Sequence, residues 1–347
     1  MDYITGKNIL LLCYNFFDYD KVLQQELYNL GAKNVYLKNA AYFVSSPRDD
    51  MFWSPWYKAP LYYLKNPKAR TNWTEQFKKE IANLKFDVFL VIENTSFKKS
   101  FMAYLRKQNP NIKTIWFLWD TFKVQQKYHK DYIGLFDKVY SFDREDAHKY
   151  GLSYYPDFYV KPEGKPMKKY DICFIGSANS KVTSYRIPAL AKIKRQCDEL
   201  GMKSFFYIKR ENVYRSKSFI KRVYNKLFPG NYQRIIEQYK NEDFLHTNSL
   251  SPIKCNSILR DSSIIVDLNY SNRQGMTLNA VSAIVSGKKL ITTNSKIADE
   301  LFYHPNNILI IDENNPYIDL DFIKSDIVPI NMDELVVGNW LKHIINT

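Results

Sequence analysis

The stretch Lys7-Asn-Ile-Leu-Leu-Leu-Cys-Tyr14 is a continuous apolar run, the pattern of a strand buried on both faces of a parallel sheet. Helical spacing of apolar residues follows over Tyr19 to Leu30 and stops at Gly31, a residue typical of helix C-termini. Asn34 to Leu37 then predicts a second, short strand. Strand, helix and strand within about 30 residues form a βαβ unit. The sequence therefore opens as an α/β protein.

The same alternation continues along the chain. Helices are predicted at Trp73 to Leu84, Ser100 to Lys107 and Asp143 to Gly151, and strands at Asp87 to Ile92, Thr114 to Trp119 and Asp137 to Phe142. Residues 156–168 hold three prolines and Gly164 among charged residues, a composition typical of a linker.

After the linker the alternation restarts. Strands are predicted at Tyr170 to Ile175, Lys203 to Ile208, Ser263 to Leu268, Lys289 to Thr293 and Asn307 to Asp312, with helices at Arg186 to Leu200 and Leu278 to Ser286. The sequence thus predicts two doubly wound, Rossmann-like domains, residues 1–158 and 168–347, facing each other across a cleft.

Composition narrows the class of protein. The chain has 347 residues, and its hydrophobic share of 45% suffices for two cores, which excludes a disordered chain, a collagen-like fibre and a disulfide-stapled module. Fifty Lys and Arg against 36 Asp and Glu give a net charge of +14, which favours a polyanionic partner. Nucleic acid, an anionic membrane and phosphate-bearing substrates all fit. Since no helix-turn-helix, RRM or OB pattern is present, we expect no nucleic-acid partner.

The basic charge is concentrated between residues 181 and 230, which carry 13 basic and three acidic side chains. Within residues 203–228, apolar and aromatic residues alternate with Lys and Arg, as in a helix that lies on an anionic membrane. A solvated surface is the alternative. The four scattered cysteines predict buried free thiols in a reducing compartment. The sequence therefore predicts a cytoplasmic protein, with residues 203–228 as a face for peripheral attachment to the inner membrane.

In open α/β sheets, ligands bind at the carboxyl ends of the strands. In the first domain Asp120 ends a predicted strand and could act as a general base or hold a sugar hydroxyl, with a helix N-cap before Thr121 as the alternative. Asp143 fits an N-cap better, since a helical segment follows it at once.

In the second domain, the strand that ends at Ile175 is followed by Gly176 and Ser177, whose turn could bring N–H groups close to a phosphate. Arg186, Lys209 and Arg210 are assigned to the same phosphate-binding side of this domain, where they would supply positive charge.

The segment Arg273-Gln274-Gly275-Met276-Thr277 opens the helix predicted from Leu278. Gly275 permits close backbone approach, Thr277 can cap the helix, and the helix dipole favours an anion. An ordinary capped helix is the alternative. No G-x-G-x-x-G or P-loop motif is present. We expect neither a cofactor nor an obligatory metal, because a helix N-terminus with Lys and Arg can itself stabilise an anion.

Five stretches, in order along residues 85–312, resemble bacterial GT-B glycosyltransferases of lipopolysaccharide and capsule biosynthesis, often grouped with CgeB-like proteins. They are Trp116 to Asp120, Asp137 to Leu152, Tyr170 to Ser177, Lys288 to Asn294 and Phe302 to Ile308. The resemblance implies a hexosyltransferase that moves sugar from a nucleotide-sugar, held mainly by the second domain, to a cell-surface glycan or lipid-linked acceptor held by the first.

The resemblance is incomplete in the glycine-containing segment. The group carries Gln two places before the Gly, Arg four places after it and Glu seven places after it, where this chain has Arg273, Asn279 and Ser282. We assign Asn279 and Ser282 to the donor site with the segment. Three explanations stay open. Either the donor differs from that of the group, or Arg273 and Asn279 re-form the donor site, or the activity is reduced. A catalytically silent subunit that binds a partner enzyme or a glycan is the alternative function.

Overall fold

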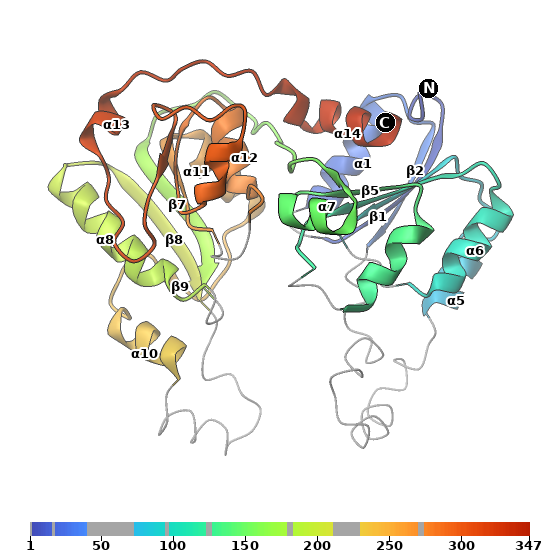
Figure 1. Cartoon of the computed structure of the whole chain (residues 1–347), viewed down its shortest axis with the longest axis horizontal. Coiled ribbons are helices and arrows are strands. Elements are labelled where there is room, and N and C mark those ends of the chain that lie inside the picture. The colour runs from blue at the N-terminus through green and yellow to red at the C-terminus, as the bar shows by residue number, and fades with distance from the viewer. Residues whose placement is uncertain are drawn as a thin grey trace. The chain divides into compact units, whose positions relative to one another are not determined.

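The structure, a computed structural model, describes residues 2–15, 18–39, 73–93, 97–122, 127–178, 183–210, 230–269 and 274–347. Its contacts divide the chain into two compact units. The first unit holds residues 1–156 together with 337–347, and the second holds residues 157–336. Each unit contains a six-stranded sheet with helices packed along it (Figure 1).

The first sheet is parallel throughout and has the strand order β2-β1-β3-β4-β5-β6. Its strands are β1 (Asn8–Cys13), β2 (Asn34–Asn39), β3 (Val88–Ile92), β4 (Lys113–Leu118), β5 (Lys138–Ser141) and β6 (Ser153–Tyr154). Every side chain of Ile9–Cys13 and Val88–Ile92 is fully buried. Since helices cover both faces of such a sheet, the unbroken apolar runs are explained.

Helices connect these strands at the positions that the periodicity predicts. The predicted helices are α1 (Tyr19–Asn29), α5 (Trp73–Glu80), α6 (Lys99–Gln108) and α7 (Arg144–Tyr150). The 3₁₀ helix η3 (Lys127–Leu135) was not predicted. Helix α7 shows how local sequence sets its ends. The Asp143 side chain accepts a hydrogen bond from the Asp146 N–H (3.1 Å), and Gly151 ends the helix in the left-handed conformation (φ 64°). The prediction that Asp143 caps this helix is confirmed.

The last helix, α14 (Val337–Asn346), packs with the first unit, although the sequence places residues 168–347 together in one second domain. Its Trp340 is fully buried, contacts Phe117 of β4 at 4.7 Å between ring centroids, and donates its indole N–H to the Pro156 carbonyl (2.9 Å). An apolar helix joins the core that it covers, and its position in the sequence does not decide which core that is.

The second sheet is also parallel and has the order β12-β11-β10-β7-β8-β9. Its strands are β7 (Tyr170–Ala178), β8 (Ser204–Arg210), β9 (Leu245–His246), β10 (Ser262–Asp267), β11 (Lys289–Thr292) and β12 (Ile308–Ile310). Counted within the unit, the order reads 3-2-1-4-5-6, the order of a dinucleotide-binding Rossmann sheet. The predicted doubly wound α/β fold is confirmed.

The second unit has helices α8 (Arg186–Glu199), α10 (Asn231–Gln238), α11 (Pro252–Arg260), α12 (Leu278–Val285) and α13 (Leu320–Lys324), with the 3₁₀ helices η4 (Ser295–Asp299) and η5 (Asp333–Leu335). Helices α8 and α12 follow strands that lead to opposite edges of the sheet, so right-handed crossovers place them on opposite faces. Helices α10, α11 and α13 are absent from the sequence prediction. For α11 a signal existed, since Ser251 caps a helix that begins at Pro252.

All four cysteines are free and buried, as predicted. Burial raises the pKa of Cys173 to about 11 and that of Cys197 to about 12. These thiols are therefore neutral, inert core residues near neutral pH.

Candidate functional site

The second sheet opens at the point where its strand order reverses. Strands β7 and β10 pair as far as Cys173 and Ile265, and β7 then continues along β8 to Ala178. A crevice at this place, beyond the carboxyl ends of the strands, is where open α/β sheets bind ligands. Of the described residues that the sequence assigns to a donor site, Arg186, Thr277 and Asn279 make contacts at this place.

Gly176 and Ser177 lie within strand β7, which corrects the prediction of a turn at these residues. They pair with Ile208 and Lys209 of β8. A Cβ at Gly176 would come within 2.6 Å of the buried Phe174 ring, so the ring explains the glycine without any ligand. The sequence prediction ended this strand too early, at Ile175, because glycine is also a common turn residue.

Arg186 joins the two strand ends at the crevice. Its buried guanidinium donates to the Leu268 carbonyl beyond β10 (2.7 Å) and to the Ser177 carbonyl in β7 (2.8 Å). The arginine thus satisfies carbonyls that strand pairing leaves open, and holds the crevice in shape.

The residues that open α12 form a tightly bonded corner. Thr277 caps the helix, since its hydroxyl accepts from the Ala280 N–H (3.2 Å), and the same hydroxyl donates to the buried Asp267 carboxyl (2.7 Å). Burial raises the pKa of Asp267. Within the described ranges, the N–H groups of Leu278 and Asn279 have no acceptor, as expected for the first turn of a helix. The corner therefore presents the positive end of a helix to the crevice.

Asn279 and Ser282 differ in their contacts. The Asn279 amide donates to the Ile175 carbonyl (3.0 Å), on the side of β7 that β10 no longer covers. It therefore ties α12 to β7 at the place where β7 no longer pairs with β10. Ser282 is half-buried on the same helix, one turn further along.

The other predicted donor residues are placed as follows. Gln274 and the buried Gly275 and Met276 lead directly into the corner. Lys209, which is exposed, and Arg210 end β8 on the same edge of the sheet. Arg273 lies outside the described residues.

In the first unit, Asp120 is half-buried just beyond the end of β4. The described residues that follow it, Thr121 and Phe122, are not helical. Asp120 is therefore not the N-cap of a helix that begins at Thr121. The Phe122 N–H instead donates to the Asp146 carboxylate (2.6 Å).

Two further carboxyl groups lie at this end of the first sheet, those of Asp20 and Glu93, and Asp20 is not among the residues that the sequence singles out. Asp20, in the first turn of α1, is only 3% exposed. Its Oδ1 has no hydrogen-bond partner in the described part of the chain. Glu93, just after β3, has a left-handed backbone (φ 76°) and accepts from the Trp119 N–H (2.8 Å). Burial, and then the negative charges of both carboxyl groups, raise the pKa of Cys13, so each of them lies near that thiol. The signal in the sequence was a pair of aspartates, Asp18 and Asp20, directly after the first strand.

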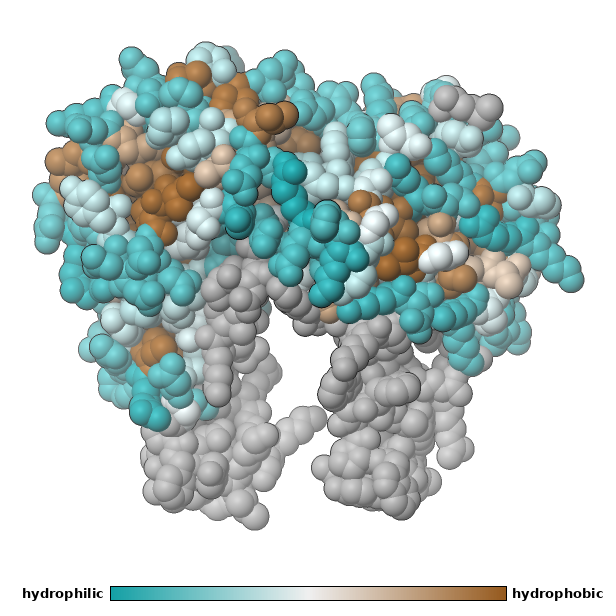
Figure 2. All heavy atoms as spheres, viewed as in Figure 1, coloured by the Kyte–Doolittle hydropathy of each residue, from teal (hydrophilic) through white to brown (hydrophobic). Residues whose placement is uncertain are grey.

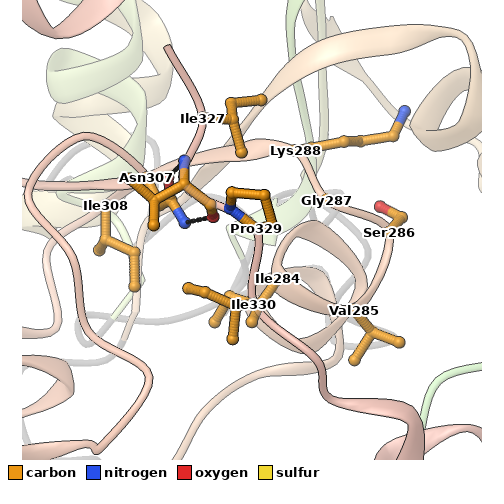
Figure 3. Close-up of a pocket in the computed structure, with 11 residues that line it drawn as sticks. Ile284, Val285, Ser286, Gly287, Lys288, Asn307, Ile308, Ile327, Pro329 and Ile330 are labelled. Atoms are coloured by element: carbon orange, nitrogen blue, oxygen red, sulfur yellow. Dashed lines mark hydrogen bonds between the residues drawn. The ribbon is translucent and has the colours of Figure 1, made fainter. Parts of the chain in front are cut away.

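A pocket of about 320 Å³ lies at the amino ends of strands β11 and β12 of the second sheet (Figure 3). It is lined by Gly287 and Lys288, which precede β11, and by Asn307, which precedes β12. The Asn307 side chain binds both the N–H (2.8 Å) and the C=O (2.7 Å) of Val328 across it. Since ligands of such sheets bind at the carboxyl ends, this pocket does not belong to the candidate site.

Within the described ranges, no group of three or more His, Cys, Asp or Glu side chains is arranged to hold a metal ion. None of the described helices is both long and apolar enough to cross a bilayer. On the viewed face, hydrophilic residues cover much of the described surface and hydrophobic ones form separate patches (Figure 2). Of the predicted membrane face at 203–228, residues 211–228 lie outside the described part.

No family model and no curated protein matches the chain. Solved structures do. The N-terminal domain of Candida albicans trehalose-6-phosphate phosphatase is 11% identical with a TM-score of 0.50, over 100% of this chain and 94% of its own. A UDP-forming trehalose-phosphate synthase from Burkholderia vietnamiensis is 10% identical with a TM-score of 0.50, over 98% and 93%. The chain has a GT-B-type fold.

An E. coli structure described as trehalose-6-phosphate bound with UDP-2-fluoro glucose is similar to the same degree, with 11% identity, a TM-score of 0.50 and coverage of 97% and 94%. At such identities the likeness establishes the fold alone. The chemistry must therefore be argued from this chain's own residues.

Proposed function

We propose that this protein is a glycosyltransferase that binds a nucleotide-sugar at the carboxyl edge of its second sheet. The observation that carries the proposal is the corner at Thr277, where a helix N-terminus meets the crevice of a 3-2-1-4-5-6 sheet. A diphosphate leaving group gains negative charge as the glycosidic bond breaks, and helix N–H groups and cations stabilise that charge. The similar E. coli structure is described with a UDP-sugar bound, which supports the same class of donor.

The reaction follows from these parts. The bond between the anomeric carbon and the diphosphate oxygen breaks, and the acceptor hydroxyl oxygen bonds to that carbon. The hydroxyl proton passes to a base, for which we propose Asp120. Lys209, Arg210 and Arg273 would supply positive charge near the diphosphate, so no divalent metal is required.

The cellular role is the finer part of the proposal. We infer that the acceptor is a glycan or lipid-linked sugar of lipopolysaccharide, capsule or a related polysaccharide, reached from the inner membrane face through residues 203–228. Vesicles with anionic lipid should then bind the protein, and moderate salt should release it. Equal binding to neutral vesicles would count against membrane attachment through these basic residues.

Nucleotide binding is the direct test. Calorimetric titration with UDP, GDP and CMP should show one of them binding in the micromolar to millimolar range. Arg273→Ala should weaken that binding by about 1–3 kcal/mol, the scale of a charged hydrogen bond. If the folded protein binds none of the three, the donor site is wrong, and a silent subunit becomes the better interpretation.

Asp120→Asn should lower turnover at least about tenfold with little change in melting temperature, because the amide cannot take a proton from the acceptor hydroxyl. The rate of sugar transfer and a thermal melt, measured on one preparation, check this. A fully active variant with a lower melting temperature would show that Asp120 is structural.

A further inference from the structure

Two buried asparagines bind the backbone of the loop that leads into α12. Asn269 follows β10 and Asn294 follows β11, and they are 1% and 6% exposed. The Asn269 Nδ2 donates to the Gly275 carbonyl (3.3 Å). The Asn294 Nδ2 donates to the Gln274 carbonyl (3.3 Å) and the Gly275 carbonyl (3.4 Å). Two consecutive carbonyl groups of the loop therefore point at these side chains.

Both asparagines are themselves held in place. The Asn294 Oδ1 accepts from the Lys296 N–H (3.1 Å), which leaves its amide nitrogen as the group that faces the loop. The Asn269 N–H donates to the Thr293 hydroxyl (2.9 Å), and its carbonyl accepts from the Tyr185 hydroxyl. Two strand ends thus supply a fixed pair of amide donors.

The planarity of the peptide bond fixes the direction of the N–H groups in this loop. In a trans peptide the N–H points opposite to the C=O. With the carbonyls of Gln274 and Gly275 turned toward the asparagines, the N–H groups of Gly275 and Met276 point away from them. These N–H groups directly precede the first turn of α12. Consecutive N–H groups of this kind form an anion-binding concavity.

We propose that Asn269 and Asn294 are positioning residues that turn these two peptides so that their N–H groups face the diphosphate of the donor. The inference rests on the proposed donor site and names what prepares it. The asparagines do not touch the ligand. They act on the Gly275 backbone, which explains why the crevice holds two buried amides beside one short glycine-containing loop.

The test removes the amide donor and keeps the shape. Asn294→Asp places an oxygen against the two carbonyls, so the peptides are expected to turn away. Asn294→Ser removes the amide but keeps an oxygen for the Lys296 N–H, and serves if the aspartate variant is poorly folded. Asn307→Asp is the matched control, because Asn307 is a buried asparagine of the same unit that also donates to a backbone carbonyl, at the opposite edge of the sheet.

Calorimetry with inorganic pyrophosphate, a nucleoside and its diphosphate separates the outcomes. Both Asn294 variants should bind pyrophosphate and the diphosphate at least about tenfold more weakly and the nucleoside as the wild type does, with Asn307→Asp unchanged for the phosphates. Equal binding by folded Asn294 variants, equal loss of nucleoside and diphosphate, or no pyrophosphate binding by the wild type would overturn the inference. Pyrophosphate binding that depends on Asn294, without any nucleotide binding, would uphold it while the proposed function fails.

Discussion

Trp340→Ala is expected to destabilise the first unit by about 3–5 kcal/mol, the usual cost of removing a fully buried large aromatic side chain. The indole packs edge-on against Phe117 in the central sheet, and its N–H satisfies the Pro156 carbonyl. The substitution therefore leaves a cavity beside β4 and an unpaired carbonyl at the end of the first unit.

Hydrogen exchange locates the effect. The amides of β1, β3 and β4 should exchange much faster in Trp340→Ala, because the helix belongs to their core. Lys342→Ala, at an exposed position on the same helix, should change little. Faster exchange confined to β10 and β11 would mean that α14 stabilises the second unit instead.

Lys289→Met is expected to lower the stability of the second unit by about 2–4 kcal/mol, through the loss of a buried charged hydrogen-bond donor. The Lys289 ammonium, 4% exposed by residue, donates to the carbonyls of Phe322, Ile323 (2.9 Å) and Ser325 (2.6 Å). Burial lowers its pKa. Methionine keeps the stem of the side chain but leaves the carbonyls at the C-terminal end of α13 without their donor.

Urea unfolding followed by circular dichroism measures this change. Lys324→Met is the matched control, since Lys324 is an exposed lysine of α13, the helix whose C-terminal carbonyls Lys289 binds. A Lys289→Met protein as stable as the control would show that water replaces the ammonium without loss. Lys288, the neighbouring residue, points to the other face of the sheet and binds the carbonyls at the end of α11 in the same way.

Most of the strands and helices were predictable, because their signals are local. Ile9–Cys13 and Val88–Ile92 are unbroken apolar runs, and only a strand with helices on both faces buries all of such a run. Asp143 and Gly151 marked the two ends of α7 by their chemistry alone. Helix α10 lacked a comparable signal, since its N-cap residue is Gly230, which has no side chain that could accept a capping hydrogen bond.

The candidate site was predicted in part. The order of strands places Thr277 at the crevice, as the sequence suggested, and Arg186 lies there too. Gly176 is explained by the Phe174 ring, a contact between residues on one face of a strand that the spacing alone does not reveal. Asn269 was not singled out, because an asparagine after a strand is also a common turn residue.

What the sequence by itself determined is the class of fold, since periodicity, buried runs and helix ends are properties of neighbouring residues. Tertiary structure alone decided where distant segments meet. It placed α14 on the first unit, brought Asp20 and Glu93 near Cys13, and directed two asparagine amides at one glycine-containing loop. Each of these depends on which strands lie side by side, and long-range packing between apolar faces selects that order.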